Sequence, residues 1–421
     1  MNETFLHYVW KMQSFITNEL YTTEGESILI LKNGNYNLHA GPDFTNAKIK
    51  IGTTTWAGNI EIHVKSSDWK HHKHQLDDAY KNVILHVVYE RDDDNLQIPT
   101  LELKKIIPVN IYKKYSYLMQ TASWIPCEKN IKQVSEITIK TQLVRMLAER
   151  LEEKALRFEQ RLLQNKNDWE ETCYQLLARS FGTNVNAEPF ERLAQNLPFN
   201  LLRKHINNAQ QIEALLFGQA GFLQASFKEV YPHQLQSEYV FLQKKYKLDP
   251  LKKLEWKFLR LRPANFPTIR LSQFANFISK QDRIFQLLLE TRSYTNLQKL
   301  FTCEASGYWK EHYSFKKASP VKSTQLGKST IDLLIINTLA PLLYLYGQKT
   351  GNPQFITYAT DVLENISPEK NTIISSWFAL AIKAKSAADT QALLYLKKEY
   401  CSQKRCLDCA IGNAILQNKI S

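Results

Sequence analysis

Residues 59–65 alternate strictly between apolar and polar side chains. The apolar positions are Ile60, Ile62 and Val64, and the polar positions are Glu61, His63 and Lys65. Because successive side chains of a strand point to opposite faces, this period of two predicts a strand with one apolar face and one polar face. The polar face places a carboxylate, an imidazole and an ammonium group about 6 to 7 Å apart, at a rise of about 3.3 Å per residue.

The same kind of pattern predicts the elements around this strand. The sequence Gly41-Pro42-Asp43 predicts a turn that places Asp43 at the start of the preceding strand. Ser66, Ser67 and Asp68 are good N-cap residues for a following helix. In chain order we expect a helix over residues 3–20, strands over 26–32, 44–51 and 58–65, helical residues over 69–81, a strand over 82–89 and an edge strand over 98–103.

From about Val134 the pattern becomes helical almost throughout, as in the apolar stripe of residues 141–164. The longest apolar run, residues 331–345, is shorter than the ~20 residues of a membrane span and contains Pro341, which predicts a buried, kinked helix. The expected fold class is therefore α+β. A small α/β domain with a mixed sheet occupies residues 1–130, and a larger all-helical region occupies residues 131–421, with a further division near 263 or 320.

Charge changes the picture of the second region. The chain has 421 residues, a net charge of +13, and 54 Lys and Arg against 41 Asp and Glu. Residues 1–130 hold 14 of the basic and 15 of the acidic residues, so the remainder holds 40 against 26. This excess favours a polyanionic partner such as nucleic acid, although a solvated basic surface gives the same count. The N-terminus has no basic segment followed by an apolar core, so we expect a cytoplasmic protein that binds no membrane. The sequence does not predict the oligomeric state.

Residues 251–274 interleave basic residues with Trp256, Phe258 and Phe266. The basic residues are Lys252, Lys253, Lys257, Arg260, Arg262 and Arg270. Cations that meet phosphates beside rings that stack on bases are typical of nucleic-acid-binding segments. The alternative is that Leu254, Phe258 and Leu261 form a helical core stripe and that the basic residues face water.

Histidines and carboxylates crowd the segment after the polar strand. His71, His72, His74, Asp77 and Asp78, together with His63 and His86, suit a transition metal such as Zn, Mn or Fe(II). His72 and His74 lie two residues apart and cannot share a helix face, so they would have to act from a loop. His63 and His86 also fit supporting roles, as a general base or a phosphate contact.

Six cysteines without a secretory signal indicate reduced thiols or metal ligands. Cys401, Cys406 and Cys409 have the C-x4-C-x2-C spacing of an iron–sulfur site that lacks its fourth ligand. Cys127, Cys173 and Cys303 are the candidates for the fourth thiol, and of these we choose Cys303. A zinc site and inert buried thiols are the alternatives.

Pro42-Asp43, a strand, and then Glu61 to Lys65 followed by Ser66-Ser67 resemble the PD-(D/E)xK nuclease superfamily, whose fold is that of the restriction endonucleases. The resemblance implies that Asp43 and Glu61 hold Mg (or Mn) and that Lys65 assists the attacking water. His63 stands where the superfamily has its second acid, and Glu61, two residues earlier, would replace that acid. The supporting residues in this scheme are Asp68, His72, His74, Asp77 and His86.

Nearly the whole chain resembles an uncharacterised bacterial family, through WAGNIEIHVKSSDW, RPANFPTIRLSQ and YCSQKRCLDCAIG. That resemblance implies no activity. The leading hypothesis is a metal-dependent nuclease that acts on DNA or RNA. The alternatives are a non-catalytic scaffold that binds nucleic acid or protein, and a His-rich transition-metal hydrolase.

Overall fold

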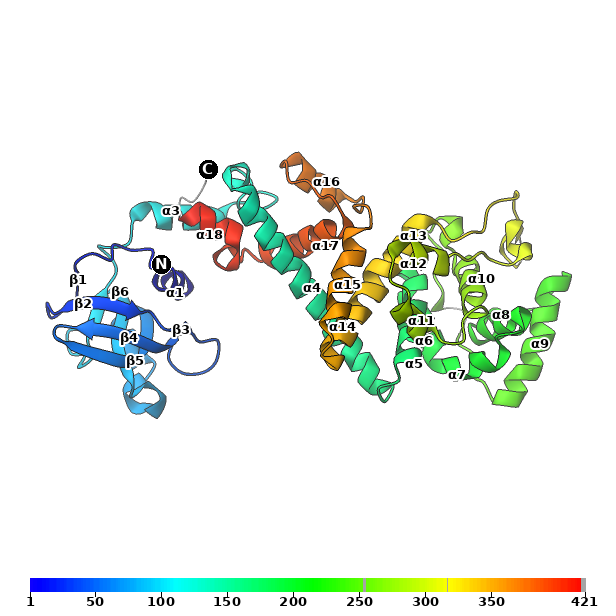
Figure 1. Ribbon diagram of the computed structural model, residues 1–421, viewed down its shortest axis with the longest axis horizontal. Helices are drawn as coiled ribbons and strands as arrows, with labels where there is room; N and C mark the ends of the chain where they lie inside the picture. Colours follow the sequence, from blue (N-terminus) through cyan, green and yellow to red (C-terminus); the bar gives the residue numbers. More distant parts are fainter. Residues whose placement is uncertain (253–254, 316, 418–421) are drawn as a thin grey trace. The chain divides into compact units, whose positions relative to one another are not determined.

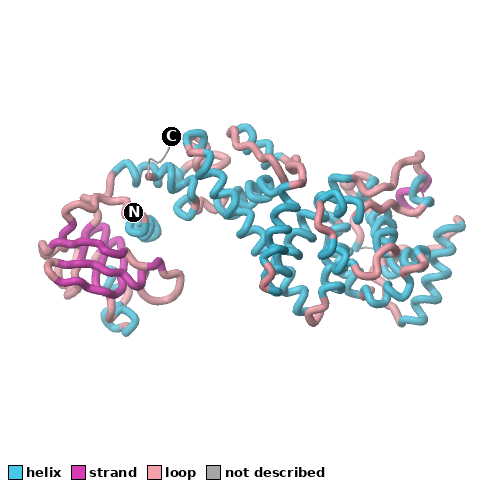
Figure 2. Tube along the Cα trace, viewed as in Figure 1, coloured by secondary structure: helices cyan, strands magenta, loops and turns pink. Residues whose placement is uncertain are grey.

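A computed structural model describes residues 1–252, 255–315 and 317–417 and divides the chain into two compact units (Figure 1). Unit 1 is Met1–Leu143 together with the segment that begins at Leu396, and unit 2 is Val144–Tyr395. The large sheet lies in unit 1, whereas unit 2 is mainly helical (Figure 2). The α+β fold class, with a mixed sheet followed by a larger helical region, is confirmed.

The division lies later than residue 130, and the C-terminal segment returns to unit 1. Long-range hydrogen bonds hold that segment in place. Lys114 Nζ, in α3 (Val109–Gln120), donates to the carbonyl oxygen of Ile415 in α18 (Ala410–Leu416) at 2.9 Å. The divisions expected near residues 263 and 320 both fall inside unit 2. Contacts between residues so far apart in sequence leave no local pattern, so periodicity does not reveal them.

The sheet of unit 1 has the strand order β1-β2-β4-β5-β6-β7, and β3 pairs with β4. The strands are β1 (Leu20–Tyr21), β2 (Ser27–Lys32), β3 (Asn35–Tyr36), β4 (Phe44–Ile51), β5 (Thr54–Lys65), β6 (Val83–Glu90) and β7 (Thr100–Glu102). The pairings from β1 to β5 are antiparallel, and β5–β6 and β6–β7 are parallel. A parallel pair needs a crossover, and here short turns of helix between β5 and β6 provide it: α2 (Asp68–His71), η1 (His74–Leu76) and η2 (Asp78–Tyr80).

Both faces of β5 are covered along its second half. Ile60 and Ile62 are fully buried, and the polar positions Glu61 and His63 are only 5% and 1% exposed. The helix α1 (Glu3–Lys11) packs against β5. Gly58 allows β5 to approach β6 closely, because a Cβ atom there would lie 2.4 Å from Ile84 Cγ2. The polar face that the alternation predicts is therefore an interior surface.

Two helices are shorter than the patterns predict. The helix expected over residues 3–20 ends at Lys11, and Gln13 follows with a left-handed φ of 46°. The helix expected over residues 69–81 ends after one turn, because Lys73 takes a φ of 60°. Left-handed backbone cannot continue a right-handed helix, so each of these residues starts a turn.

Unit 2 packs short helices around aromatic and aliphatic side chains such as Phe217, Phe274 and Trp309. The helix α4 (Glu136–Gln164) runs across the division between the units. The helices that follow are α5 (Trp169–Phe181), α6 (Thr183–Asn196), α7 (Phe199–Leu202), α8 (Ala209–Gln219), α9 (Val230–Tyr246), α10 (Pro267–Ile278), α11 (Ile284–Glu290), α12 (Tyr294–Leu300), α13 (Lys328–Leu334), α14 (Ala340–Thr350), α15 (Pro353–Glu364), α16 (Thr372–Ala379) and α17 (Ala387–Tyr395). A two-stranded ribbon, β8 (His312–Ser314) and β9 (Lys317–Ala318), is added to them.

The apolar run near residue 340 forms the interrupted helix that the sequence indicates. By length and composition Lys328–Thr350 could cross a membrane, but 67% of its most apolar window is buried inside the fold, as in a core helix. A π-helical turn, Ile335–Leu339, joins α13 to α14 just before Pro341. Proline has no N–H to donate to the preceding turn, which explains the interruption there.

Candidate metal centre

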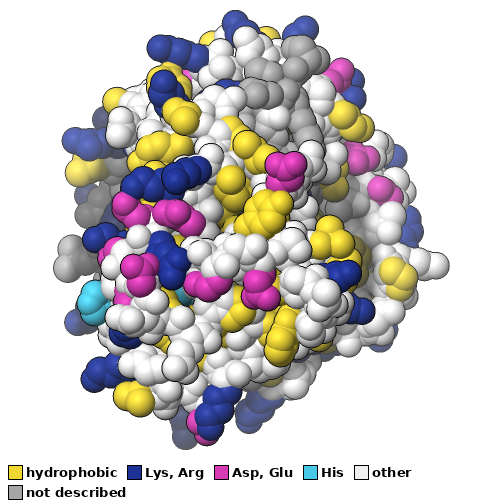
Figure 3. Space-filling model, turned by 90° about the vertical axis from the view of Figure 1, so that its left-hand side faces the viewer, with side chains coloured by type: hydrophobic (Ala, Val, Ile, Leu, Met, Phe, Trp, Pro, Cys, Tyr) yellow, Lys and Arg dark blue, Asp and Glu magenta, His cyan; other side chains and the backbone are white. Residues whose placement is uncertain are grey.

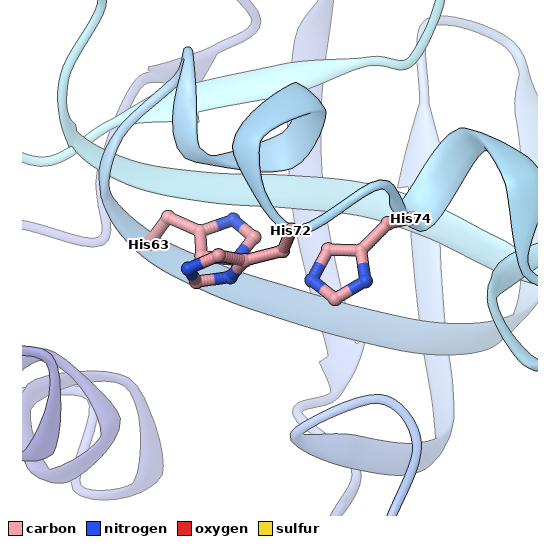
Figure 4. A group of neighbouring side chains, drawn as sticks. All are labelled: His63, His72 and His74. Atoms are coloured by element: carbon pink, nitrogen blue, oxygen red, sulfur yellow. The ribbon is translucent and has the colours of Figure 1, made fainter.

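Three histidine side chains meet over β5 (Figure 4). His63 comes from β5, His72 follows α2, and His74 starts η1. One ring nitrogen from each lies within 4.8 Å of the other two. The left-handed turn at Lys73 lets His72 and His74 approach from the same side. His72 and His74 therefore lie on a turn, as we expected from their separation of two residues.

Glu61 adds an oxygen atom to these nitrogens. His63 Nε2 lies 3.1 Å from His72 Nδ1 and 3.5 Å from Glu61 Oε1. The same oxygen lies 3.3 Å from His74 Nε2, which is buried and makes no hydrogen bond. In a tetrahedral site with metal–ligand bonds of about 2.0 to 2.1 Å, neighbouring ligand atoms are about 3.3 Å apart. The three nitrogens are close enough to share one ion, and Glu61 Oε1 lies near those of His63 and His74; we call these four atoms the metal centre.

A second layer of side chains orients these ligands. His63 Nδ1 lies 2.8 Å from His86 Nε2, a hydrogen bond that leaves His63 Nε2 directed at the metal centre. Tyr80 stacks on the His74 ring with centroids 3.8 Å apart, and Trp69 packs against both His74 and His86. Partners of this kind fix the tautomer and the ring orientation of metal ligands. The sequence analysis identified His86 as a supporting residue but not Trp69 or Tyr80. The pattern of hydrophobic and polar positions does not show that these two rings pack against the histidines.

The surroundings of His63, His74 and the neighbouring His86 favour their neutral imidazole forms. Burial, with His86, His74 and His72 as neighbours, lowers the pKa of His63 to about 2. Burial and the nearby His74 lower the pKa of His86 to about 4, and burial lowers that of His74 as well. A neutral imidazole keeps a lone pair for a metal ion, so these rings are in the state that binds metal.

Asp43 and Glu61 hold each other by hydrogen bonds to the backbone. The Asp43 N–H donates to Glu61 Oε2 at 3.1 Å, and the Ile62 N–H donates to Asp43 Oδ2 at 2.9 Å. His7, from α1, places its Nε2 3.2 Å from the same Asp43 oxygen. Burial and the negative charge of Asp43 raise the pKa of Glu61 to about 8. A cation beside Glu61 would offset both effects, because it favours the charged carboxylate.

Three residues from the sequence prediction have local contacts at the edge of this region. The Lys65 ammonium lies 3.7 Å from Asp92 Oδ2 and is largely exposed. Asp68 accepts a hydrogen bond from the Lys65 N–H at 3.0 Å, and Asp77 caps η2 through the Ala79 N–H. These contacts shape the turns that carry His72 and His74.

A second candidate region is a basic groove in unit 2. Its volume is about 1140 Å³. The cations that line it are Arg150, Lys154, Arg157, Arg161, Arg179, Arg262 and Arg270, and the acidic residues in its lining are Glu191 and Glu369. Burial, together with the nearby Arg150, lowers the pKa of Lys154 to about 7, even though Glu369 and Glu153 act against this shift. Positive charge in the groove is therefore incompletely compensated.

The groove contains only part of the basic segment expected to bind nucleic acid. Arg262 and Arg270 line it, but Arg270 is 5% exposed and donates to Asn265 and Gln273. Lys252, Lys257 and Arg260 are exposed outside the groove, and Lys253 and Leu254 lie outside the described residues. Trp256 is buried and donates to the carbonyl oxygen of Ala220 at 2.8 Å, so it belongs to the core and is not free to stack on a base.

Four groove cations that the sequence analysis missed do have a sequence signal. Arg150, Lys154, Arg157 and Arg161 follow one another at intervals of four, three and four residues. This spacing places them on one face of α4, in line with Leu143 and Leu147 nearer its N-terminus. On the face shown in Figure 3, by contrast, basic and acidic side chains are interspersed.

Comparison with known proteins assigns the chain to a family. Residues 3–372 match the family described as protein of unknown function, DUF2851. The chain belongs to the DUF2851 family. This confirms the near-full-length resemblance that the sequence indicated. No curated protein and no solved structure matches the chain. The DUF2851 match includes the metal centre and ends before Cys401, Cys406 and Cys409.

The turn at Lys73 gives a direct test of the metal centre in this DUF2851 chain. Replacing Lys73 with valine is expected to lower Mn²⁺ affinity about tenfold, or about 1.4 kcal/mol, because a β-branched residue resists the left-handed conformation. Lys73→Gly should keep the affinity within about threefold, since glycine adopts this conformation freely. Isothermal titration with Mn²⁺ measures both variants. Equal affinity of Lys73→Val and the wild type would show that the turn does not position His72 and His74.

Proposed function

We propose that the chain is a metal-dependent phosphodiesterase that hydrolyses nucleic acid, with His63, His72, His74 and Glu61 as the metal ligands. The observation that carries the proposal is the convergence of three imidazole nitrogens at the spacing of a single ion, with the carboxylate of Glu61 beside two of them. An ion held there would polarise a phosphoryl oxygen and lower the pKa of a bound water.

The residues around the metal centre control its access to solvent and would take up a proton from water. His72 is exposed, so the metal centre opens to solvent on its side. His63 and His74 are nearly buried and keep water from the opposite side. Asp43, with 21% of its side chain exposed, is more accessible than Glu61 and would accept the proton of an attacking water.

The donor set favours a transition metal over the Mg expected from the sequence. Mg²⁺ prefers an octahedron of oxygen atoms, many of them from water. Imidazole nitrogen suits Mn, Fe(II) or Zn better, and three of the four ligand atoms here are imidazole nitrogens. Asp43 and Glu61 therefore enter the proposal in different roles, Glu61 as a ligand and Asp43 as a neighbouring base.

The order of elements supports a relation to the PD-(D/E)xK nucleases. The core of those nucleases is a helix, a strand meander, a second helix and a further strand. The elements α1, β2, β4, β5, α2 and β6 follow one another in this order along the chain. If Glu61 itself is aligned with the superfamily's second acid, the lysine that follows two residues later in the superfamily corresponds to His63. An imidazole then stands in the place of that lysine. Lys65, by contrast, pairs with Asp92. Because folds host many chemistries, the proposal depends on the metal centre and not on this order.

The basic groove supports a polyanionic substrate. Seven cations and two acids line it, and the lowered pKa of Lys154 reflects burial and repulsion among neighbouring cations. Phosphates in the groove would relieve that repulsion and release counterions, which is the main source of affinity between proteins and nucleic acid.

Incubation of the purified chain with labelled single- and double-stranded DNA and RNA tests the proposal. We expect cleavage with Mn²⁺ and no cleavage with a chelator. Glu61→Gln should lower the rate about 100-fold or more, because it removes a charged ligand while keeping the shape of the side chain. The control is Glu90→Gln, at the end of the neighbouring strand β6, where the carboxylate pairs with Lys104.

Two outcomes would contradict the proposal. Nucleic acid that is bound but not cleaved with Mn²⁺, Zn²⁺ or Mg²⁺ would favour the non-catalytic scaffold. Cleavage that Glu61→Gln leaves unchanged would remove the metal centre from the reaction.

A further inference from the structure

A fourth cysteine of unit 1 lies beside the C-terminal cysteine motif. Two contacts join the segment before Cys127 to the C-terminal segment. The Lys404 ammonium donates to the carbonyl oxygen of Met119, and the Lys397 ammonium lies 5.3 Å from the centre of the Trp124 ring. The loop that leads to Cys127 is thus fixed against the helical turn that precedes Cys401.

The four thiols influence one another electrostatically. Cys406 and Cys409 lie close enough to Cys127 to act on its thiol, and Cys127, Cys406 and Cys409 lie close enough to act on that of Cys401. All six cysteines of the chain lie in its described part and are reduced thiols. Cys127, Cys406 and Cys409 are buried, and Cys401 is partly exposed.

The backbone around these thiols is closely constrained. Cys406 and Cys409 flank a 3₁₀ turn that leads into α18. Gly412 packs onto this turn, because a Cβ atom at that position would lie 2.1 Å from the carbonyl oxygen of Cys406. The Cys127 carbonyl oxygen accepts the N–H groups of Asn130 and Ile131 at 3.0 and 2.9 Å. The two chain segments therefore present their thiols from rigid turns.

Three cations lie near the thiols. Lys397 lies near Cys401, and Lys404 lies near Cys406. Arg405, which precedes Cys406, lies over the ring of Tyr400, which precedes Cys401, at 4.3 Å from the ring centre. A metal cluster with four thiolate ligands carries net negative charge, which nearby lysines and arginines stabilise.

We propose that Cys127, Cys401, Cys406 and Cys409 bind an iron–sulfur cluster. The C-x4-C-x2-C spacing with one distant cysteine is a known ligand pattern for such clusters. Within the described part of the chain, the side chains spaced for a single ion are His63, His72 and His74, and the cysteines are not such a group.

Cys303, chosen from the sequence as the fourth ligand, belongs to unit 2. Its charged neighbours are Lys280 and Arg270, and it is 2% exposed. It therefore serves as the matched control, a buried cysteine outside the four-thiol site. This site does not depend on the proposed nuclease function.

Elemental analysis of the full chain, purified without air, tests the cluster. We expect iron and inorganic sulfide in equal amounts, about two or four of each per chain, and the visible absorbance of iron–sulfur charge transfer. Cys127→Ser and Cys409→Ser should each lower the iron content at least fivefold, and Cys303→Ser should leave it unchanged. His71→Ala, which changes neither site, should also leave it unchanged. Inorganic sulfide, which a single ion at the metal centre does not bring, separates this result from failure of the metal centre.

One zinc per chain without sulfide would overturn the proposal, as would wild-type protein that holds neither iron nor sulfide after reconstitution with both. Full iron content in Cys127→Ser would also overturn it. Where the serine variants do not fold, electron paramagnetic resonance of the chemically reduced wild type decides, because a reduced cluster gives a signal and a zinc site gives none.

Discussion

Replacing His72 and His74 together with alanine is expected to lower Mn²⁺ affinity at least about 100-fold, or about 2.7 kcal/mol. The two side chains supply half of the ligand atoms of the metal centre, and both come from a surface turn and not from the sheet. The fold of unit 1 should therefore survive their loss. At about 100 times its dissociation constant, Mn²⁺ should stabilise the wild type by about 2.7 kcal/mol, and the double variant should lack that increase. Isothermal titration and thermal unfolding with and without Mn²⁺ measure both effects.

His71→Ala is the matched control for this prediction. His71 precedes His72 directly, but its side chain is 72% exposed and lies near Asp68. Its loss should change Mn²⁺ affinity by less than about twofold. If the double variant binds Mn²⁺ as tightly as the wild type, the histidines do not form the metal centre.

Replacing Lys154 and Arg157 with alanine is expected to weaken nucleic-acid binding about tenfold or more at low salt. Both side chains line the basic groove from one face of α4. For each cation that no longer neutralises a phosphate, the slope of log affinity against log salt should become less negative by about 0.9 for duplex DNA and about 0.7 for a single strand. Filter binding or fluorescence anisotropy at several salt concentrations measures the slope.

Lys154 also predicts a pH dependence of this binding. Its pKa, lowered to about 7 chiefly by burial, means that it loses its charge as the pH rises through neutrality. The charged form attracts phosphate, so affinity should fall from pH 6 to pH 8 in the wild type, and less steeply in Lys154→Ala. Lys252→Ala with Lys257→Ala is the control, because both residues are exposed outside the groove. Weaker binding in this control alone would place the interface on the segment that the sequence suggested.

Local pattern predicted the sheet well. The strand expected over residues 44–51 is β4 (Phe44–Ile51), and the strand expected over residues 82–89 differs from β6 by one residue at each end. The period of two at Ile60 and Ile62 located β5, but the strand starts at Thr54, before the alternation becomes clear. Side-chain alternation reflects burial, so it is strongest where a strand has one core face.

The metal centre was only partly visible in the sequence. The many histidines between His63 and His86 pointed to His63, His72 and His74 as candidate ligands. The separation of two residues between His72 and His74 showed that these two cannot lie on one face of a helix. The pattern did not show that Lys73 reverses the chain, because left-handed conformations of non-glycine residues depend on tertiary contacts. The role of Cys127 was hidden for another reason. Its neighbours at Lys397 and Lys404 lie about 270 residues further along the chain, and no local signal spans that distance.

The return of the C-terminal segment to unit 1 has a consequence for synthesis. The sheet, α1 and Cys127 leave the ribosome early, and all of unit 2 must follow before Cys401 emerges. The sheet can begin to fold during translation, but the four-thiol site cannot assemble until the chain is almost finished. Under the cluster proposal, loading of this site is therefore a late step in maturation, and a chain cut short anywhere in unit 2 would carry Cys127 without the three other proposed ligands.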